Sequence, residues 1–288
     1  MKEIRLVGVV NDHGFQKTKF SLDVLLQRNP DEFSPVTVES LMEFQWCLFV
    51  DEMKRLYKGV AWNNAVVFDG DELIGNADQF LQWAVDNYGY KDTRPGLFYT
   101  VVAQEAYKTY INDRKQRDVT YLDISVEGEL LGRLVIELYI KTCPKTCANF
   151  KALCTAEKGV SESTGVHLSY LNSLIHRIVP GGWVQGGDII DGAGSGGESI
   201  YGKTFDDECY AVQHNGRGIV GMVNCGHNTN SSQFYITLKA TPWMNTNYVA
   251  FGRVIEGYEV LNKLEKLSTY NERPQEKCLI SNCGIYQP

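Results

Sequence analysis

Apolar residues in the first 112 positions recur alternately with the spacing of strands and with the spacing of helices. The unbroken apolar run Ile4–Val10 is typical of a strand that is covered on both faces. Spacings of three to four residues predict helices, and Asp69-Gly70 predicts a hairpin turn. The expected strands are Ile4–Val10, Ser34–Val38, Ala65–Phe68 and Glu72–Ile74. The expected helices are Phe15–Leu26, Leu41–Leu56, one capped by Asn76 or Asp78, and one from about Leu97 to Ile111. This order predicts an α/β layer domain over residues 1–112.

The pattern changes after a charged segment that is poor in apolar residues, for which we predict a linker over residues 113–118. Val119–Val126 and Leu131–Tyr139 then have the pattern of two strands joined by a turn. Helices are expected over Cys143–Glu157, with Pro144 in the first turn, and over Glu256–Leu267. Short strands with two helices predict a closed barrel capped by helices over residues 119–288.

The composition is that of an ordinary globular protein: 43% of the 288 residues are hydrophobic, 22% are charged, and the net charge is −7. Both halves of the chain are acidic, so we expect no nucleic-acid partner and no membrane partner. No apolar stretch approaches the roughly 20 residues of a membrane-spanning helix. The first apolar run ends at Val10 without a cleavage site, which indicates a strand rather than a signal peptide. We therefore expect a cytoplasmic protein.

The eight cysteines are too sparse for a disulfide scaffold and contain no C-x-x-C pair. We expect reduced thiols packed among apolar residues, no metal site and no cofactor. Cys143 and Cys147 lie one helical turn apart, but no third or fourth ligand is near them in the sequence. Packing is therefore their expected role.

The stretch VVFDGDELIGNADQFLQWA and the order of elements around it resemble the second half of glutaredoxin and thioredoxin-like domains. The loop Asn11–Gln16 has no cysteine where that family keeps its redox pair. The family's cis-proline also has no counterpart, since Asn63-Asn64-Ala65 stands there. Because disulfide exchange needs a thiolate, the resemblance implies a domain without redox activity that serves as a docking platform.

Four strings in the second region carry a more specific resemblance: IHRIVPGGWVQGGD, GSGGESIYGKTFDDE, GMVNCGHNTNSSQFYITL and FGRVIEGYEVL. In this order they resemble the cyclophilin family of peptidyl-prolyl cis-trans isomerases, over residues 119–288. The resemblance implies an all-β cyclophilin-like barrel of eight strands, capped by two helices. It also implies isomerase activity on X–Pro peptide bonds without a cofactor.

Isomerisation of an X–Pro bond needs no nucleophile, acid or metal, because its barrier of roughly 18–20 kcal/mol comes from amide resonance. A site must anchor the proline ring and aim a donor at the prolyl nitrogen, which gains a lone pair only when the amide twists. Arginine suits this task because it is always charged. The position in the family's motif assigns the role to Arg177.

The resemblance implies the remaining site residues as well. Gln185 would hold the substrate carbonyl and orient Arg177. Asn224 would offer its backbone groups to the peptide. Val223 and Cys225 flank Asn224, and Gln233 lines the edge of the site. Trp243 and Met244 would wall the proline pocket.

Five positions depart from the family's pattern: Gly182 for phenylalanine, Trp183 for methionine, Tyr235 for phenylalanine, Val223 for alanine and Tyr248 for histidine. The ring missing at Gly182 removes burial worth roughly 1.5–3 kcal/mol. Trp183 either refills that space or swings across the pocket and closes it. The hydroxyl of Tyr235 needs a partner if the pocket floor is dry.

These departures remove the apolar half of the site and leave Arg177, which favours a proline-peptide binder with little or no turnover. The alternative is an active isomerase that uses Arg177 to stabilise the twisted amide. A third hypothesis is a scaffold whose two domains dock into a larger assembly. The two-domain arrangement resembles one subgroup of the family, which implies protein partners, a ciliary or microtubule assembly among them, and the cilium or flagellum axoneme as a location.

Three further features have structural explanations. His176 is expected to be a hydrogen-bonded core histidine, because the chemistry needs no proton transfer. The glycines between Gly186 and Gly197 are expected to serve tight turns, since no helix follows them as in a phosphate-binding loop. Val160–Ser169 is expected to be an exposed variable loop.

Overall fold

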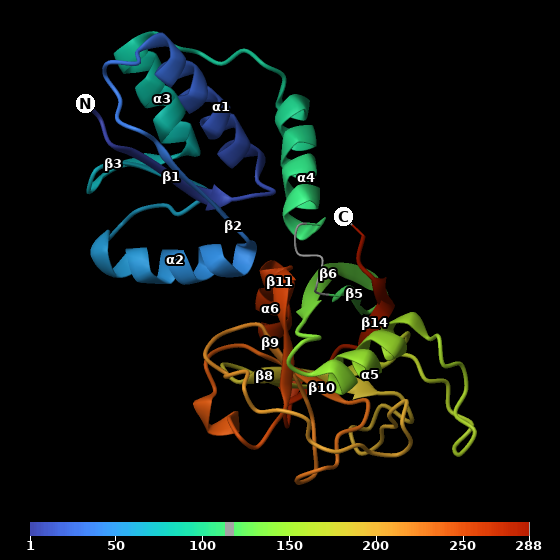
Figure 1. Cartoon of the computed structure of the whole chain (residues 1–288). Helices are drawn as coiled ribbons and strands as arrows, with labels where there is room; N and C mark the ends of the chain where they lie inside the picture. The colour runs from blue at the N-terminus through green and yellow to red at the C-terminus, as the bar shows by residue number, and fades with distance from the viewer. Residues whose placement is uncertain (113–117, 288) are drawn as a thin grey trace. The chain divides into compact units, whose positions relative to one another are not determined.

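The computed structural model describes residues 1–112 and 118–287. The chain divides into two compact units, Met1–Lys115 and Gln116–Gln287, which we call unit 1 and unit 2 (Figure 1). The linker expected over 113–118 lies outside the described residues except for Asp118, which begins a strand. No helix within 1–112 or 118–287 is long and apolar enough to span a membrane.

Unit 1 is an α/β domain built on a four-stranded sheet with the order β2-β1-β3-β4. Strand β1 runs parallel to β2 and antiparallel to β3. The sheet separates α2 from α1 and α3 (Figure 1). The strands are β1 (Ile4–Val9), β2 (Thr37–Leu41), β3 (Ala65–Asp69) and β4 (Glu72–Asn76). The helices are α1 (His13–Arg28), α2 (Glu43–Leu56), α3 (Ala77–Tyr88) and α4 (Gly96–Asn112).

Successive residues of the central strand β1 pack on opposite faces of this sheet, as the alternation of side chains along a strand requires. Leu6 packs in the cluster that holds Phe80 of α3, whereas Val7 packs in the cluster that holds Trp46 of α2. All four side chains are buried. The unbroken apolar run Ile4–Val10 follows from this burial on two sides.

Two details of unit 1 refine the sequence-based expectations. Strand β2 begins at Thr37 rather than Ser34, because Pro35 has no N–H to donate and the ladder with β1 starts at the pair Arg5–Thr37. The cap of α3 is Asn76 rather than Asp78, since the Asn76 side chain accepts a hydrogen bond from the backbone N–H of Gln79.

Unit 2 is a closed barrel of eight antiparallel strands, which confirms the expected barrel. Helices α5 (Pro144–Thr155) and α6 (Tyr258–Glu265) pack on it, and the ring of Phe150 on α5 meets those of Phe234 and Phe251. Around the barrel the strand order is β10-β8-β7-β14-β5-β6-β11-β9. The strands are β5 (Asp118–Val126), β6 (Glu129–Leu138), β7 (Leu174–Val179), β8 (Trp183–Asp188), β9 (Ile219–Met222), β10 (Phe234–Thr237), β11 (Ala250–Glu256) and β14 (Cys278–Ile285).

Helix α6 begins two residues later than expected because the chain turns sharply before it. Gly257 has a φ of 99°, and a Cβ at this position would overlap the backbone carbonyl of Arg133. Glu256 therefore stays in β11, and the helix begins at Tyr258.

A short hairpin after α6 was not expected from the sequence. It pairs β12 (Thr269–Tyr270) with β13 (Arg273–Pro274). Its two turn residues, Asn271 and Glu272, have φ angles of 48° and 65°. The hairpin is attached to β7, because the backbone N–H of Ile178 donates to the carbonyl oxygen of Glu272 at 2.7 Å.

Candidate functional site

The register of three neighbouring strands places three of the expected site residues in one row on the outside of the barrel. Arg177 on β7 pairs with Gln185 on β8, and Gln185 pairs with Tyr235 on β10. Residues that pair across strands share a face, and their neighbours along the chain point the other way. Ile178 and Val184 accordingly fill the interior of the barrel.

Arg177 is held by a carboxylate and by an aromatic ring. Its Nε donates to Oε2 of Glu272 at 2.7 Å, and its guanidinium carbon stands 5.2 Å from the centre of the Trp183 ring. The side chain of Arg177 is 42% exposed and that of Glu272 is 44% exposed. Among the described residues, the guanidinium donates no hydrogen bond to Gln185, the partner that the sequence analysis expected.

Gln185 is buried and engages other neighbours. Its Nε2 donates to Oε1 of Gln233 at 2.9 Å, and its Oε1 accepts the indole N–H of Trp183 at 3.3 Å. Gln233 in turn donates to the carbonyl oxygens of Gly194 and Gly196. Both polar ends of the Gln185 amide are therefore occupied within the protein.

A chain of aromatic ring contacts runs from Trp183, beside Arg177, to Tyr235. Trp183 meets Trp243 edge to face with ring centres 5.8 Å apart, and Trp243 lies 6.4 Å from Tyr248. Tyr248 also meets Tyr235 at 5.9 Å. Trp243, in the 3₁₀ turn Pro242–Met244, is 56% exposed, whereas Met244 is buried. The Trp183 ring thus lies in contact with both Arg177 and Trp243.

The hydroxyl of Tyr235 has a partner that sequence reasoning missed. It lies 2.6 Å from Nε2 of His214, whose Nδ1 lies 2.9 Å from Oδ1 of Asn245. Burial lowers the pKa of His214, while burial raises the pKa of Tyr235 well above its usual value. Gly221 on β9 leaves room for the hydroxyl, because a Cβ there would overlap it. The signal available in the sequence was the tyrosine itself, whose buried hydroxyl demands a partner.

The space at Gly182 is filled in part by Val179. A Cβ built on Gly182 would lie 2.9 Å from Cγ1 of Val179 and 3.2 Å from its backbone oxygen. The phenylalanine that the family keeps at this position would therefore require Val179 to move.

The segment Val223–Cys225 borders the site and leaves backbone groups open. The N–H of Val223 donates to the carbonyl of Gln233, and the N–H of Cys225 donates to Oγ1 of Thr229. The Asn224 side chain donates to the carbonyl of Asn247 at 2.8 Å. The backbone N–H and C=O of Asn224 bond to no other part of the described chain, so both can pair with a peptide.

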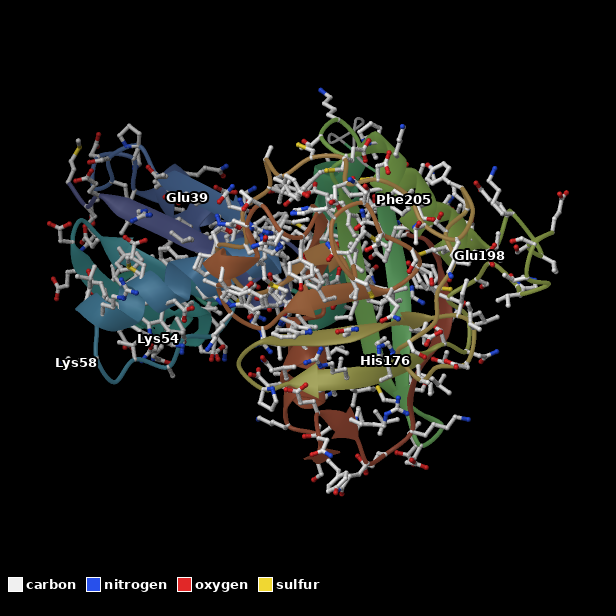
Figure 2. The ribbon with its side chains drawn as sticks, turned by 90° about the horizontal axis from the view of Figure 1, so that it is seen from below. Glu39, Lys54, Lys58, His176, Glu198 and Phe205 are labelled. Carbon is white, nitrogen blue, oxygen red and sulfur yellow. The ribbon has the colours of Figure 1, made fainter. Side chains whose placement is uncertain are left out.

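The loop Val160–Ser169 is fastened by a buried carboxylate. Glu198, labelled in Figure 2, is only 3% exposed. It accepts hydrogen bonds from the hydroxyls of Ser161 and Ser163 at 2.5 and 2.9 Å, and from that of Thr164. The hydrogen bond from Ser161 and its hydroxyl neighbours lower the pKa of Glu198. The carboxylate thus serves the loop and is not available for chemistry.

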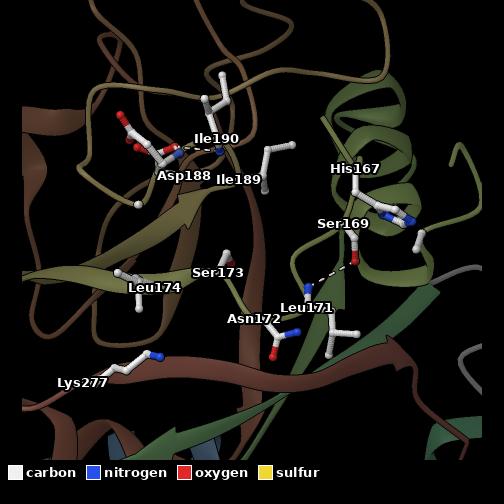
Figure 3. A pocket seen from close by; sticks show the side chains of 13 residues that line it. His167, Ser169, Leu171, Asn172, Ser173, Leu174, Asp188, Ile189, Ile190 and Lys277 are labelled. Atoms are coloured by element: carbon white, nitrogen blue, oxygen red, sulfur yellow. Dashed lines mark hydrogen bonds between the residues drawn. The ribbon is translucent and has the colours of Figure 1, made fainter. Parts of the chain in front are cut away.

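A hollow on unit 2, about 630 Å³ in volume, lies between Ser169–Leu174 and Asp188–Gly192 (Figure 3). The carboxylate of Asp188 accepts the backbone N–H groups of Ile190, Gly194 and Gly196. It therefore organises its own loop. None of the expected site residues lines this hollow.

The described residues show no cluster suited to a metal ion, since no three His, Cys, Asp or Glu side chains converge. Cys143 and Cys147 are buried in unit 2. Burial raises the pKa of Cys143 to about 12 and that of Cys147 further still. Neither thiol is a nucleophile at neutral pH.

Comparison of the sequence with those of known proteins identifies the family of the chain. The sequence profile described as "Cyclophilin type peptidyl-prolyl cis-trans isomerase/CLD" matches residues 121–285. A mouse protein named "Probable inactive peptidyl-prolyl cis-trans isomerase-like 6" is 43% identical over 286 residues, which are 98% of this chain and 91% of the mouse protein. Proteins of the same name from human and cattle are 41% and 42% identical over 285 residues, 98% of this chain, and cover 91% and 92% of those proteins. Because the profile covers more than half of the chain and the relatives align along nearly all of it, the chain belongs to the cyclophilin-type peptidyl-prolyl cis-trans isomerase family.

Proposed function

We propose that this protein is a cyclophilin that binds proline-containing peptides and turns them over slowly or not at all. The observation that carries the proposal is the place of the Trp183 ring, which lies against both Arg177 and Trp243. A prolyl nitrogen must come within about 3 Å of a donor to accept a hydrogen bond. The proline ring of a substrate and the indole of Trp183 therefore compete for the same space. The names of the relatives, which call them probable inactive, support the proposal.

The binding half of the proposal rests on groups that remain open to a peptide. The backbone of Asn224 can pair with an extended chain, and the exposed ring of Trp243 offers an aromatic face. Aromatic grooves suit proline because its ring is apolar and its backbone is already ordered. Binding of this kind does not require the guanidinium to reach the prolyl nitrogen.

The second candidate is an active isomerase that uses Arg177 to stabilise the twisted amide. Arg177 and Gln185 are retained on neighbouring strands at paired positions, which favours this candidate. The two candidates agree on binding and differ in turnover.

A peptide titration of the full-length chain tests the binding. We expect a short Ala-Pro peptide to shift NMR signals of Asn224 and Trp243 in a saturable way, and the matched Ala-Ala peptide not to. Trp243→Ala should weaken binding at least tenfold, since it removes an aromatic wall, whereas Trp243→Phe should weaken it less. Equal binding of both peptides, or no binding at all, would contradict the proposal.

For unit 1 we infer a thioredoxin-like docking domain without redox chemistry. The order of elements supports this, since a β-α-β unit is followed by helix α2, a hairpin and a further helix. The segment Asn11–Gln16, which leads into α1, contains no cysteine, and the side chain of Asp12 accepts the N–H of Phe15. Cys47, the one cysteine of this unit, lies in α2. The full-length chain should not reduce insulin; clear turnover in that assay would overturn the inference.

The setting that we propose is a protein assembly in the cytoplasm, with a microtubule-based ciliary structure as the candidate partner. The support is the resemblance of the two-domain arrangement to one subgroup of the family. Imaging of the tagged chain beside tubulin in ciliated cells tests it. Enrichment along the axoneme is the expected result, and exclusion from the cilium would contradict it.

A further inference from the structure

The turn that reaches Arg177 contains an unusual residue for its conformation. Asn271 and Glu272 both have positive φ angles, 48° and 65°, and form the two-residue turn of the β12–β13 hairpin. In such turns glycine is preferred at the second position, because other residues are strained there. Backbone strain of this kind persists where the surrounding structure holds it, and it points to a role for the side chain.

Glu272 is tied to β7 at two consecutive residues. Its carboxylate accepts from Nε of Arg177 at 2.7 Å, and its backbone oxygen accepts from the N–H of Ile178, also at 2.7 Å. Both charged side chains are nearly half exposed. An ion pair that is exposed to this extent contributes little to stability. Stabilisation of the fold is therefore a poor explanation for a strained glutamate at this position.

The consequence for Arg177 is electrostatic. Isomerisation needs a cationic donor that faces the lone pair formed on the twisted prolyl nitrogen. The carboxylate of Glu272 takes one donor of the guanidinium and offsets its positive charge at the same place. Trp183 acts differently, since its ring takes up space and carries no charge.

We propose that Glu272 is a positioning residue that suppresses isomerisation by holding Arg177 in an ion pair. This inference rests on the proposed function, in which Arg177 remains in place and turnover is low. It adds a second cause of the low turnover, which is independent of the aromatic ring.

The test measures cis–trans exchange of an Ala-Pro peptide by NMR on four full-length proteins: wild type, Trp183→Met, Glu272→Gln and the double variant. Trp183→Met opens the space, so that the charge effect becomes visible. In that background we expect Glu272→Gln to raise kcat/KM about fivefold, the range of an exposed ion pair. The dissociation constant of the peptide should stay within about twofold, because the carboxylate faces Arg177 rather than the binding edge.

Three controls make the outcome specific. Glu276→Gln changes the charge equally on the neighbouring exposed segment and should leave kcat/KM unchanged. Arg177→Ala should abolish the gain. Glu272→Gly suits the positive φ of the turn and should also raise kcat/KM, so it tests the inference even where Glu272→Gln folds poorly.

The two proposals fail in different ways. If Trp183→Met raises turnover and neither Glu272 variant adds to it, the inference about Glu272 is wrong while the proposed function stands. If the wild type already turns the peptide over rapidly and depends on Arg177, the proposed function is wrong. A gain from Glu272→Gln that survives Arg177→Ala would also overturn the inference.

Discussion

The guanidinium of Arg177 stands over the indole ring of Trp183, 5.2 Å from its centre, on neighbouring strands of the barrel. The indole N–H of Trp183 donates to Oε1 of Gln185, so the ring is held at its edge as well as at its face. A cation over an aromatic face is stabilised by the ring's quadrupole. Arg177, the residue expected to contact the substrate, is thus in contact with Trp183, which stands where the family keeps methionine.

The site at Gly182 predicts a loss of stability when the family's aromatic ring is restored. We expect Gly182→Phe to lower the free energy of unfolding by about 1–3 kcal/mol, the usual cost of overpacking, because Val179 lies against the new Cβ. Urea denaturation measures the loss. Adding Val179→Ala should recover part of it, and an unchanged midpoint for Gly182→Phe would show that the space is open.

The hydrogen bond between Tyr235 and His214 leads us to expect a loss of stability when the hydroxyl is removed. Tyr235→Phe leaves the buried Nε2 of His214 without its hydroxyl partner, and we expect a loss of about 1–3 kcal/mol in the free energy of unfolding. Tyr201→Phe is the matched control, since the hydroxyl of Tyr201 donates to the carbonyl of Lys145 at an exposed position. Equal losses in the free energy of unfolding for the two substitutions would mean that the buried hydrogen bond stabilises the fold no more than the exposed one.

Much of this site could be predicted from the sequence, because its residues lie on strands in which side chains alternate between the two faces. Once Arg177 and Gln185 fall on adjacent strands, pairing brings them to one face. Glu272 could not be found in this way. It lies 95 residues from Arg177, in a hairpin whose strands have two residues each. Strands this short show no periodic pattern of hydrophobic residues. The helix boundary at Gly257 was missed for a related reason, since a positive φ leaves no apolar signal.

Buried histidines predict that the protein loses stability in mild acid. Burial lowers the pKa of His214 and of His176 below the ordinary value of 6.5. As the pH falls through 6.5, the unfolded chain therefore binds more protons than the folded chain, and the free energy of unfolding decreases. Carboxyl groups such as Glu198, whose pKa is lowered from 4.5, act at lower pH.

Urea denaturation between pH 7 and pH 5 checks this sign. The free energy of unfolding should decrease across the interval, and His214→Gln should flatten the decrease. His167→Gln replaces an exposed histidine and should leave the slope unchanged. Stability that stays level or rises toward pH 5 in the wild type would contradict the prediction.

Cys225 offers a chemical probe of the peptide-binding edge. It is the exposed cysteine among the eight, and it follows Asn224 directly. We expect a small thiol reagent to label it first, and a saturating Ala-Pro peptide to slow that labelling several-fold by covering the edge. Cys47 in unit 1 should react at the same rate with and without peptide. Labelling of Cys225 that ignores the peptide would place the binding site elsewhere.

The central claim is that the retained Arg177 does not deliver efficient isomerisation in this site. NMR exchange on an Ala-Pro peptide, with the full-length wild type beside Arg177→Ala, measures this most directly. Gly182 and Tyr248, which stand where the family keeps phenylalanine and histidine, weaken the proline anchor by about 1.4 kcal/mol each and lower kcat/KM roughly 100-fold. The Trp183 ring, which lies against Arg177, lowers it further by taking the space of the substrate's proline. The account predicts wild-type exchange near the uncatalysed rate and little difference from Arg177→Ala. Rapid wild-type exchange that Arg177→Ala abolishes would contradict it and would make the protein an ordinary isomerase.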